Sequence, residues 1–180
     1  MSVISLMKRQ RSMLDRPEIS MFNNMIFYRY WPKQKVRCHY LLSNYYRAGL
    51  NVIPKKNSLQ QVCDALEQNH AVIFVLDQHA SLANRDGVAV EFFGKKAGTY
   101  RSLATLSRHT GVPVVPAAGY RLDNGRHVLE FFEPIPWQDY GNTKESIYRN
   151  TLAYNQALER IILAHPEQWL WLHKRWKLKE

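Results

Sequence analysis

The sequence has few cysteines and no long apolar segment. Its 180 residues include only Cys38 and Cys63, which form no Cys-x-x-Cys pair and follow no secretory signal. Two such cysteines are typical of reduced thiols in a cytosol-facing chain, and they do not predict a structural zinc site. No stretch reaches about 18 uninterrupted apolar residues, so a spanning helix is not predicted. We therefore expect any membrane contact to be peripheral.

Acidic residues are also scarce. Against 25 lysines and arginines the chain has 15 aspartates and glutamates, which gives a formal net charge of +10. This excess favours an acidic partner such as phosphate, an anionic membrane or an acidic protein. No RNP-type motif, zinc finger or helix-turn-helix signature is present, so we do not expect a nucleic-acid partner. A length of 180 residues, 46% of them hydrophobic and without a linker, predicts a single domain over residues 1–180.

Strand-like and helix-like segments alternate along the chain. Strands are predicted where short apolar runs end at turn residues, and helices where apolar residues recur at helical spacing. The predicted strands are residues 2–7, 50–55, 71–77, 87–94, 112–122 and 127–135. The predicted helices are residues 18–33, 35–49, 58–69, 99–111 and 143–164. In the third of these helices Ser58 is the predicted N-cap, and Leu59, Val62 and Leu66 form the buried stripe.

The run "AVIFVLD" (71–77) is typical of a strand buried on both faces of a sheet. "DNGR" (123–126) indicates a hairpin turn, and Asn142 with Glu145 indicates a capping box. Together these features predict an α/β fold with a mostly parallel central sheet flanked by helices and an antiparallel edge hairpin. Ligands of such sheets bind beyond the carboxyl ends of the strands, a rule that selects Asp77 and Gln78.

The stretch "HPEQWLWLHKRW" (165–176) holds three of the five tryptophans among cations. Indoles and cations at one site favour the interface of an anionic membrane, whereas a packed helix end is the alternative. Mixed packing and lipid contact is the interpretation that we adopt. The predicted membrane contacts are Trp169, Trp171, Lys174, Arg175, Trp176 and Lys177.

Three motifs carry a family resemblance: "LDQH", "GVAVEFFGKKAGTYRSLATLSRHTGVPVVPA" and "HPEQWLWLHKRWK". Together they resemble the bacterial lipid A biosynthesis acyltransferases, within the lysophospholipid acyltransferase superfamily. The resemblance implies transfer of a fatty acyl group from acyl carrier protein or coenzyme A to a phosphorylated glycolipid. It places the protein peripherally at the cytoplasmic face of the bacterial inner membrane and requires no cofactor besides the acyl donor.

The same resemblance implies residues that bind rather than react. Arg47 matches an arginine suited to phosphate, although a surface cation at a helix end fits equally well. Lys95, Lys96 and Arg101 suit a phosphorylated headgroup or the acidic surface of the carrier protein, the alternative being a solvated face. The full set of substrate-binding candidates is Arg47, Asp77, Gln78, Gly94, Lys95, Lys96, Thr99 and Arg101. Thr99 is predicted to cap the following helix, and "GVPVVPA" (111–117) to back the acyl pocket.

The catalytic motif of the family is a histidine followed by four residues and then Asp or Glu. None of the seven histidines has an acid at that spacing, so the chain resembles the family without its N-terminal part. Loss of a general base typically costs on the order of 10²–10⁴ in rate, so we expect no turnover by the isolated chain. His79 is a weak candidate for a substitute base. The alternative function is a catalytically inactive module that binds anionic lipid.

Overall fold

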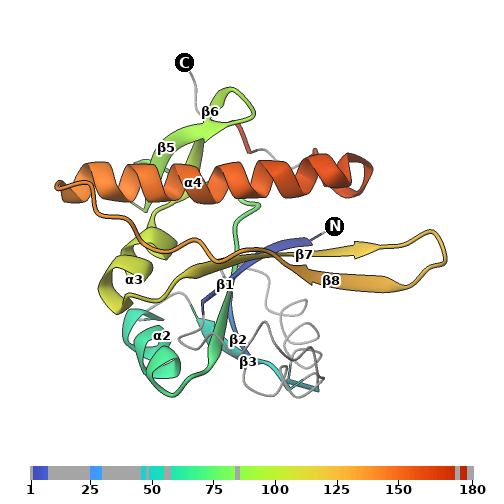
Figure 1. Ribbon diagram of the computed structural model, residues 1–180, viewed down its shortest axis with the longest axis horizontal. Helices are drawn as coiled ribbons and strands as arrows, with labels where there is room; N and C mark the ends of the chain where they lie inside the picture. The colour runs from blue at the N-terminus through green and yellow to red at the C-terminus, as the bar shows by residue number, and fades with distance from the viewer. Residues whose placement is uncertain are drawn as a thin grey trace. The chain divides into compact units, whose positions relative to one another are not determined.

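The computed structural model describes residues 2–7, 25–29, 46–47, 49–54, 58–83, 86–172 and 175–177. They form a mixed α/β structure, which confirms the predicted fold class at that level (Figure 1). The chain divides into two compact units. One unit spans residues 6–74, and the other spans residues 75–180 together with residues 1–5. The backbone of β1 (Ser2–Met7) is extended as predicted.

The unit of residues 6–74 contains parallel strands. β2 (Met25–Arg29) pairs in parallel with both β3 (Asn51–Pro54) and β4 (Ala71–Val75). The strands predicted at 50–55 and 71–77 are thereby confirmed, and the side chains of residues 71–74 are buried, as an unbroken apolar run indicates. The helix predicted over 18–33 is wrong at β2, where pairing with two neighbouring strands overrides the apolar spacing. Most of the helix predicted over 35–49 lies outside the described residues.

The helix α2 (Ser58–Glu67) packs against β3 in the same unit. Its buried side chains are Val62, Cys63, Ala65 and Leu66. The prediction for Leu59 is wrong, because this side chain is 56% exposed. Leu59 shares a face with Leu66, seven residues later, but it stands in the first turn of α2, ahead of the residues that are buried.

In the other unit, α4 (Thr143–Ala164) packs against a two-stranded antiparallel ribbon. The ribbon consists of β5 (Gly87–Phe92) and β6 (Lys95–Tyr100). The predicted helix 99–111 begins too early, because residues 99 and 100 belong to β6. The observed helix, α3 (Ser102–Thr110), starts after this strand. α3 ends as predicted at Gly111, which adopts a left-handed φ of 68°. The missed strand had no Asn-Gly or Asp-Gly turn signal ahead of it.

The same unit contains the predicted antiparallel hairpin. β7 (Val114–Arg121) pairs with β8 (His127–Phe131) through the turn "DNGR". Within the turn, Leu122 N donates to Arg126 O at 2.8 Å and Gly125 has a φ of 82°. The hairpin prediction is therefore confirmed, while a single mostly parallel central sheet stays a prediction.

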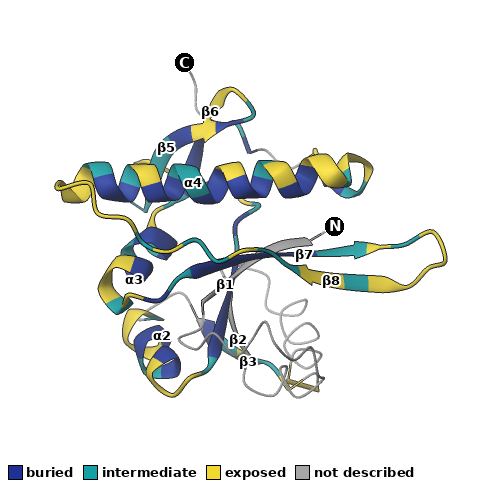
Figure 2. Ribbon diagram, viewed as in Figure 1, coloured by how far each residue is buried: buried dark blue, intermediate teal, exposed yellow. Residues whose placement is uncertain are grey.

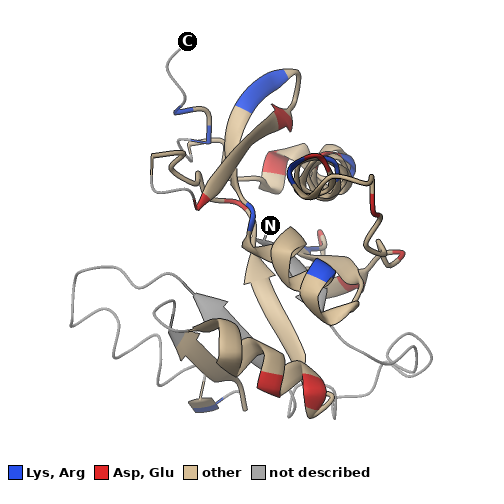
Figure 3. Ribbon diagram, turned by 90° about the vertical axis from the view of Figure 1, so that its left-hand side faces the viewer, with Lys and Arg blue, Asp and Glu red and all other residues tan. Residues whose placement is uncertain are grey.

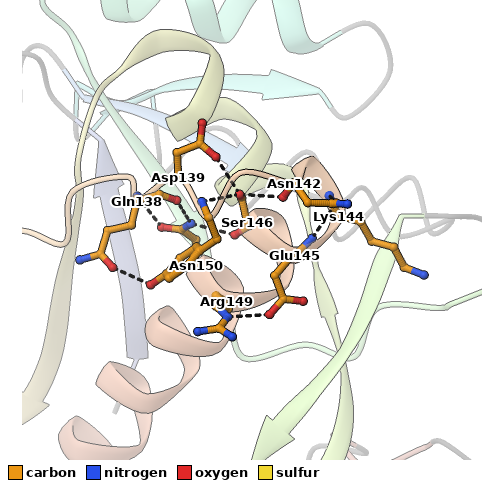
Figure 4. Close-up of polar contacts among 9 residues, drawn as sticks. Gln138, Asp139, Asn142, Lys144, Glu145, Ser146, Arg149 and Asn150 are labelled. Atoms are coloured by element: carbon orange, nitrogen blue, oxygen red, sulfur yellow. Dashed lines mark hydrogen bonds and ion pairs between the residues drawn. The ribbon is translucent and has the colours of Figure 1, made fainter.

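Polar side chains form hydrogen bonds at the N-terminus of α4 (Figure 4). The Asn142 side chain caps the helix by accepting from Lys144 N at 2.8 Å and Glu145 N at 3.4 Å. The Glu145 carboxylate accepts instead from Arg149 Nε at 2.6 Å. The predicted N-cap is confirmed, and the second half of the capping box is replaced by this ion pair.

One face of α4 is buried along its length, as Figure 2 shows. Ile147, Tyr154, Leu158, Ile161 and Ile162 belong to this face. The helix covers the predicted residues 143–164. Within the described part of the chain, no helix combines the length and the apolarity needed to cross a membrane.

Candidate functional site

The loop of residues 77–80 follows β4 and lies against β6. Ala80 N donates to Gly98 O at 2.9 Å. A Cβ atom at Gly98 would collide with the Ala80 carbonyl oxygen and would lie 2.8 Å from Cε1 of His79. Glycine is therefore required at this position by the close approach of the two backbones.

Arg175 is the polar centre of this region, although its side chain is only 1% exposed. Its Nη1 donates to Gln78 O and Gly98 O, each at 2.8 Å. Its Nη2 donates to Thr99 Oγ1 at 2.9 Å and to Asn155 Oδ1 at 3.2 Å. One guanidinium therefore joins the loop, β6 and α4. We call Arg175 and these four partners the Arg175 cluster.

The guanidinium is buried at an electrostatic cost. Burial lowers the pKa of Arg175 to about 10, and the nearby charge of Asp77 acts in the opposite direction. Its Cζ atom lies 5.0 Å from the centroid of the Phe92 ring, within range of a cation–π interaction. With a pKa of about 10, Arg175 is charged at neutral pH, so its hydrogen bonds are charge-assisted.

His79 is held by the main chain of the same arginine. Its Nδ1 lies 3.2 Å from Arg175 O, and its side chain is half-buried. Because a carbonyl oxygen only accepts, Nδ1 carries the proton of this bond in the neutral ring. Nε2 is then the nitrogen with the free lone pair, the form that a general base requires. The loop therefore presents an oriented imidazole.

The turn between β5 and β6 is also fixed by side chains from elsewhere. Phe93 and Gly94 form it with φ angles of 50° and 71°. Phe93 N donates to Glu159 Oε1 at 2.7 Å, and Trp176 Nε1 donates to Phe92 O at 3.0 Å. The Trp176 ring stacks on the Phe92 ring with 5.6 Å between centroids. α4 and the segment around Trp176 therefore hold this turn together.

The predicted substrate-binding residues fall into three groups. Asp77, Gln78 and Thr99 lie around Arg175, whereas Gly94, Lys95 and Lys96 form the β5–β6 turn and the start of β6. Arg101 is exposed at the N-terminus of α3, and Arg47 is exposed in the other unit. The capping role predicted for Thr99 is wrong. Its hydroxyl accepts from Arg175 and Asn155, and the N-cap residue of α3 is Arg101, which makes no side-chain capping bond.

Two of the predicted membrane contacts are wrong. Arg175 is buried among acceptors on the 77–80 loop, β6 and α4, and Trp169 is only 7% exposed. Trp176 is half-buried against Phe92. Trp171 and Lys177 are exposed, and Lys174 lies outside the described residues. Of the three tryptophans in this segment, Trp169 is thus in the core, Trp176 is half-buried and Trp171 is on the surface.

Sequence reasoning missed Asn155 and Glu159. Asn155 is fully buried on the apolar face of α4, where its Nδ2 also donates to Glu91 O at 3.2 Å. A polar residue on the buried face of a predicted helix was the available signal, since such groups are generally hydrogen-bonded. Glu159 lies on α4 one turn further, and no local motif marks it.

A separate pocket of about 530 Å³ lies between α4 and the β7–β8 hairpin. Pro116, Ala118 and Ile161 are among its apolar lining residues, and Glu130 and Arg160 among its charged ones. Its volume is in the range of small-molecule sites. Across the described ranges, no three His, Cys, Asp or Glu side chains converge in a way that could hold a metal ion.

Comparison with protein families shows a match over most of the chain. The family described as "Bacterial lipid A biosynthesis acyltransferase" matches residues 25–178. A comparison with curated proteins finds no match. The matched range includes the loop of residues 77–80, the β5–β6 turn and the Arg175 cluster.

Proposed function

The chain belongs to the bacterial lipid A biosynthesis acyltransferase family, and from this premise we propose that it transfers a fatty acyl group to a lipid A precursor. The donor is acyl carrier protein or coenzyme A, and the acceptor is a hydroxyl of the phosphorylated glycolipid. The reaction takes place at the cytoplasmic face of the bacterial inner membrane, with the protein bound peripherally. The observation that carries the proposal is the family match over residues 25–178.

Acyl transfer to a hydroxyl requires a base for the hydroxyl proton and donors for the oxyanion. The oxygen attacks the thioester carbonyl, the carbon–sulfur bond breaks, and the thiol leaves with a proton. His79 is the group that we propose for the base, because its Nδ1 bond to Arg175 O supports a free lone pair on Nε2. Asp77 and Gln78 precede His79 in the same loop, and we propose both as substrate-binding residues.

Substrate binding is assigned to exposed cations and to apolar surface. We propose Lys95, Lys96 and Arg101 for the phosphates of the glycolipid or the acidic surface of the carrier protein, with Gly94 shaping the turn and Thr99 fixing β6. Arg47 is proposed for a phosphate as well. The pocket that contains Pro116 supports the acyl-chain role proposed for "GVPVVPA". A single domain with a mostly parallel central sheet is the architecture that we propose for this arrangement.

The second candidate is an inactive module that binds anionic lipid. The observation that favours it is the absence, throughout the sequence, of a histidine with an acid five positions later. In that case the oriented imidazole of His79 is a structural feature, and the net charge of +10 serves lipid binding alone.

The two candidates are separated by incubating the chain with an acyl donor and a lipid A precursor and measuring product by mass spectrometry. The matched variants are His79→Gln and His109→Gln, the latter on an exposed residue of α3. Turnover that falls on the order of 10²–10⁴-fold in His79→Gln and persists in His109→Gln supports acyl transfer. Product at the level of a no-enzyme control, from a folded chain that still binds anionic vesicles, supports the inactive module.

A further inference from the structure

Apolar side chains gather on the exposed surface beside the β5–β6 turn. Leu170, Trp171 and Leu172 are 54%, 47% and 88% exposed. The Trp171 ring lies 5.7 Å from the half-buried ring of Phe93, between centroids. Trp171 is held in place, since its Nε1 donates to Pro166 O at 2.8 Å. A cluster of exposed apolar residues on one surface is a mark of an interaction site.

Lysines surround the same turn. Lys95 and Lys96 are exposed at the start of β6, and Figure 3 shows a blue stretch on this strand beside the red tip of the strand that pairs with it. Lys95 is the cross-strand partner of Phe92, and Phe92 is the ring on which Trp176 stacks. The exposed Lys177 follows Trp176 directly. We call this set the turn surface: Phe93, Lys95, Lys96, Leu170, Trp171, Leu172 and Lys177.

The turn surface carries an excess of positive charge. Glu91 is the cross-strand partner of Lys96 and offsets one of the three lysines. Glu159 also approaches the turn, but its carboxylate accepts from the Phe93 backbone N–H and lies half-buried. The outward face is therefore apolar at Leu170, Trp171 and Leu172, with cations beside it.

Side chains from outside the ribbon form hydrogen bonds with the backbone of the turn. Three successive residues at the end of β5 form hydrogen bonds with side chains from elsewhere. Asn155 Nδ2 donates to Glu91 O, and Trp176 Nε1 donates to Phe92 O. Phe93 N donates to Glu159 Oε1. Phe93 has a φ of 50°, a left-handed conformation that residues with a side chain rarely adopt. Such strain persists where the surroundings impose it, often at functional positions. The protein thus holds an aromatic ring and a lysine pair in a fixed arrangement.

We propose that the turn surface docks on an anionic lipid bilayer. Phe93, Trp171 and Leu172 enter the headgroup region, where an amphipathic indole is favoured, and Lys95, Lys96 and Lys177 bind lipid phosphates. An acidic protein would use the lysines and leave Leu172 without an apolar partner, so the bilayer is the occupant that accounts for both features. This inference rests on the proposed function, whose acceptor is a lipid, and it adds the β5–β6 turn to the contact.

The test is co-sedimentation with vesicles of phosphatidylcholine, with and without phosphatidylglycerol, and it uses no acyl donor or acceptor. Binding and acyl transfer can therefore fail independently of each other. The charge variant is the double substitution Lys95→Gln and Lys96→Gln, with Arg108→Gln on α3 as its control. The apolar variant is Leu172→Gln, with Leu163→Gln as its control because Leu163 is also exposed, at 63%, and lies outside the turn surface. Circular dichroism establishes that each variant is folded.

We expect the lysine pair to contribute about thirty-fold to the partition coefficient on anionic vesicles, since each lysine near such a surface contributes about 1 kcal/mol. High salt weakens binding of the wild type and reduces this difference. Leu172→Gln also binds more weakly, whereas Arg108→Gln and Leu163→Gln bind as the wild type does. Binding that is unchanged in either test variant, or insensitive to salt, overturns the proposal. It is equally overturned if the chain binds soluble acyl carrier protein through these lysines and does not bind vesicles.

Discussion

Replacing Arg175 by methionine should destabilise the fold while conserving most of the side-chain volume. Arg175 makes four hydrogen bonds from a side chain that is 1% exposed. Charge-assisted bonds contribute about 1.5–3 kcal/mol each, so the four together contribute at least about 6 kcal/mol. Two of the acceptors keep another partner in the variant, because Gly98 O also accepts from Ala80 N and Thr99 Oγ1 from Asn155 Nδ2. We therefore take the loss of the four hydrogen bonds as about 6 kcal/mol, the lower end of the range.

Against this contribution stands the cost of burying the charge. The fall in the pKa of Arg175 to about 10 corresponds to about 3 kcal/mol against the charged form, a cost that methionine does not carry. The difference predicts that Arg175→Met lowers the free energy of unfolding by about 3 kcal/mol.

The assay is urea unfolding followed by circular dichroism, with Lys177→Met as the control on an exposed neighbour. The control should remain within about 0.5 kcal/mol of the wild type. A double-mutant cycle with Asn155→Ala should give a coupling of at least about 0.5 kcal/mol, because Asn155 Oδ1 accepts from the guanidinium. If Arg175→Met is as stable as the wild type, or if the cycle shows no coupling, the guanidinium does not hold the loop, β6 and α4 together.

Two further predictions concern a close backbone contact and a buried phenol. Gly98→Ala should lower the free energy of unfolding by about 3 kcal/mol, since its Cβ would collide with the Ala80 carbonyl oxygen. Gly141→Ala, with a φ of 77° and open space around its Cβ, should lower it by only about 1 kcal/mol. Equal shifts in thermal unfolding would contradict this difference. Burial raises the pKa of Tyr154 to about 12, so above its ordinary value the unfolded chain loses this proton first and stability falls as pH rises toward 12. Urea unfolding at about pH 8 and about pH 11 should show a loss about 1 kcal/mol larger in the wild type than in Tyr154→Phe, and equal losses would refute the assignment.

Much of the secondary structure follows from local patterns. The hairpin turn "DNGR", the N-cap Asn142 and the terminating Gly111 each act within a few residues, so the sequence predicts them correctly. β2 could not be predicted in this way. Its apolar residues fit a helix as well as a strand, and the parallel pairing with β3 and β4 decides between the two.

The candidate site shows the same division. Asp77 and Gln78 follow from the rule that ligands bind beyond the ends of buried strands, and the structure places both beside Arg175. Arg175 itself has the sequence context of a surface cation, between Lys174 and Trp176. Its acceptors lie on β6, on α4 and in the loop, and no pattern of neighbours reveals acceptors that are distant in the sequence.

The Arg175 cluster joins distant parts of the chain, and this affects the rates of folding and unfolding. Its bonds to Gln78 O, Gly98 O and Thr99 Oγ1 span 97, 77 and 76 residues. Closing loops of that length costs chain entropy before any contact is gained, so such contacts tend to form after the transition state for folding. Interactions that are absent from the transition state act mainly on the unfolding rate. We therefore predict that loss of Arg175 mainly raises the unfolding rate and changes the folding rate little.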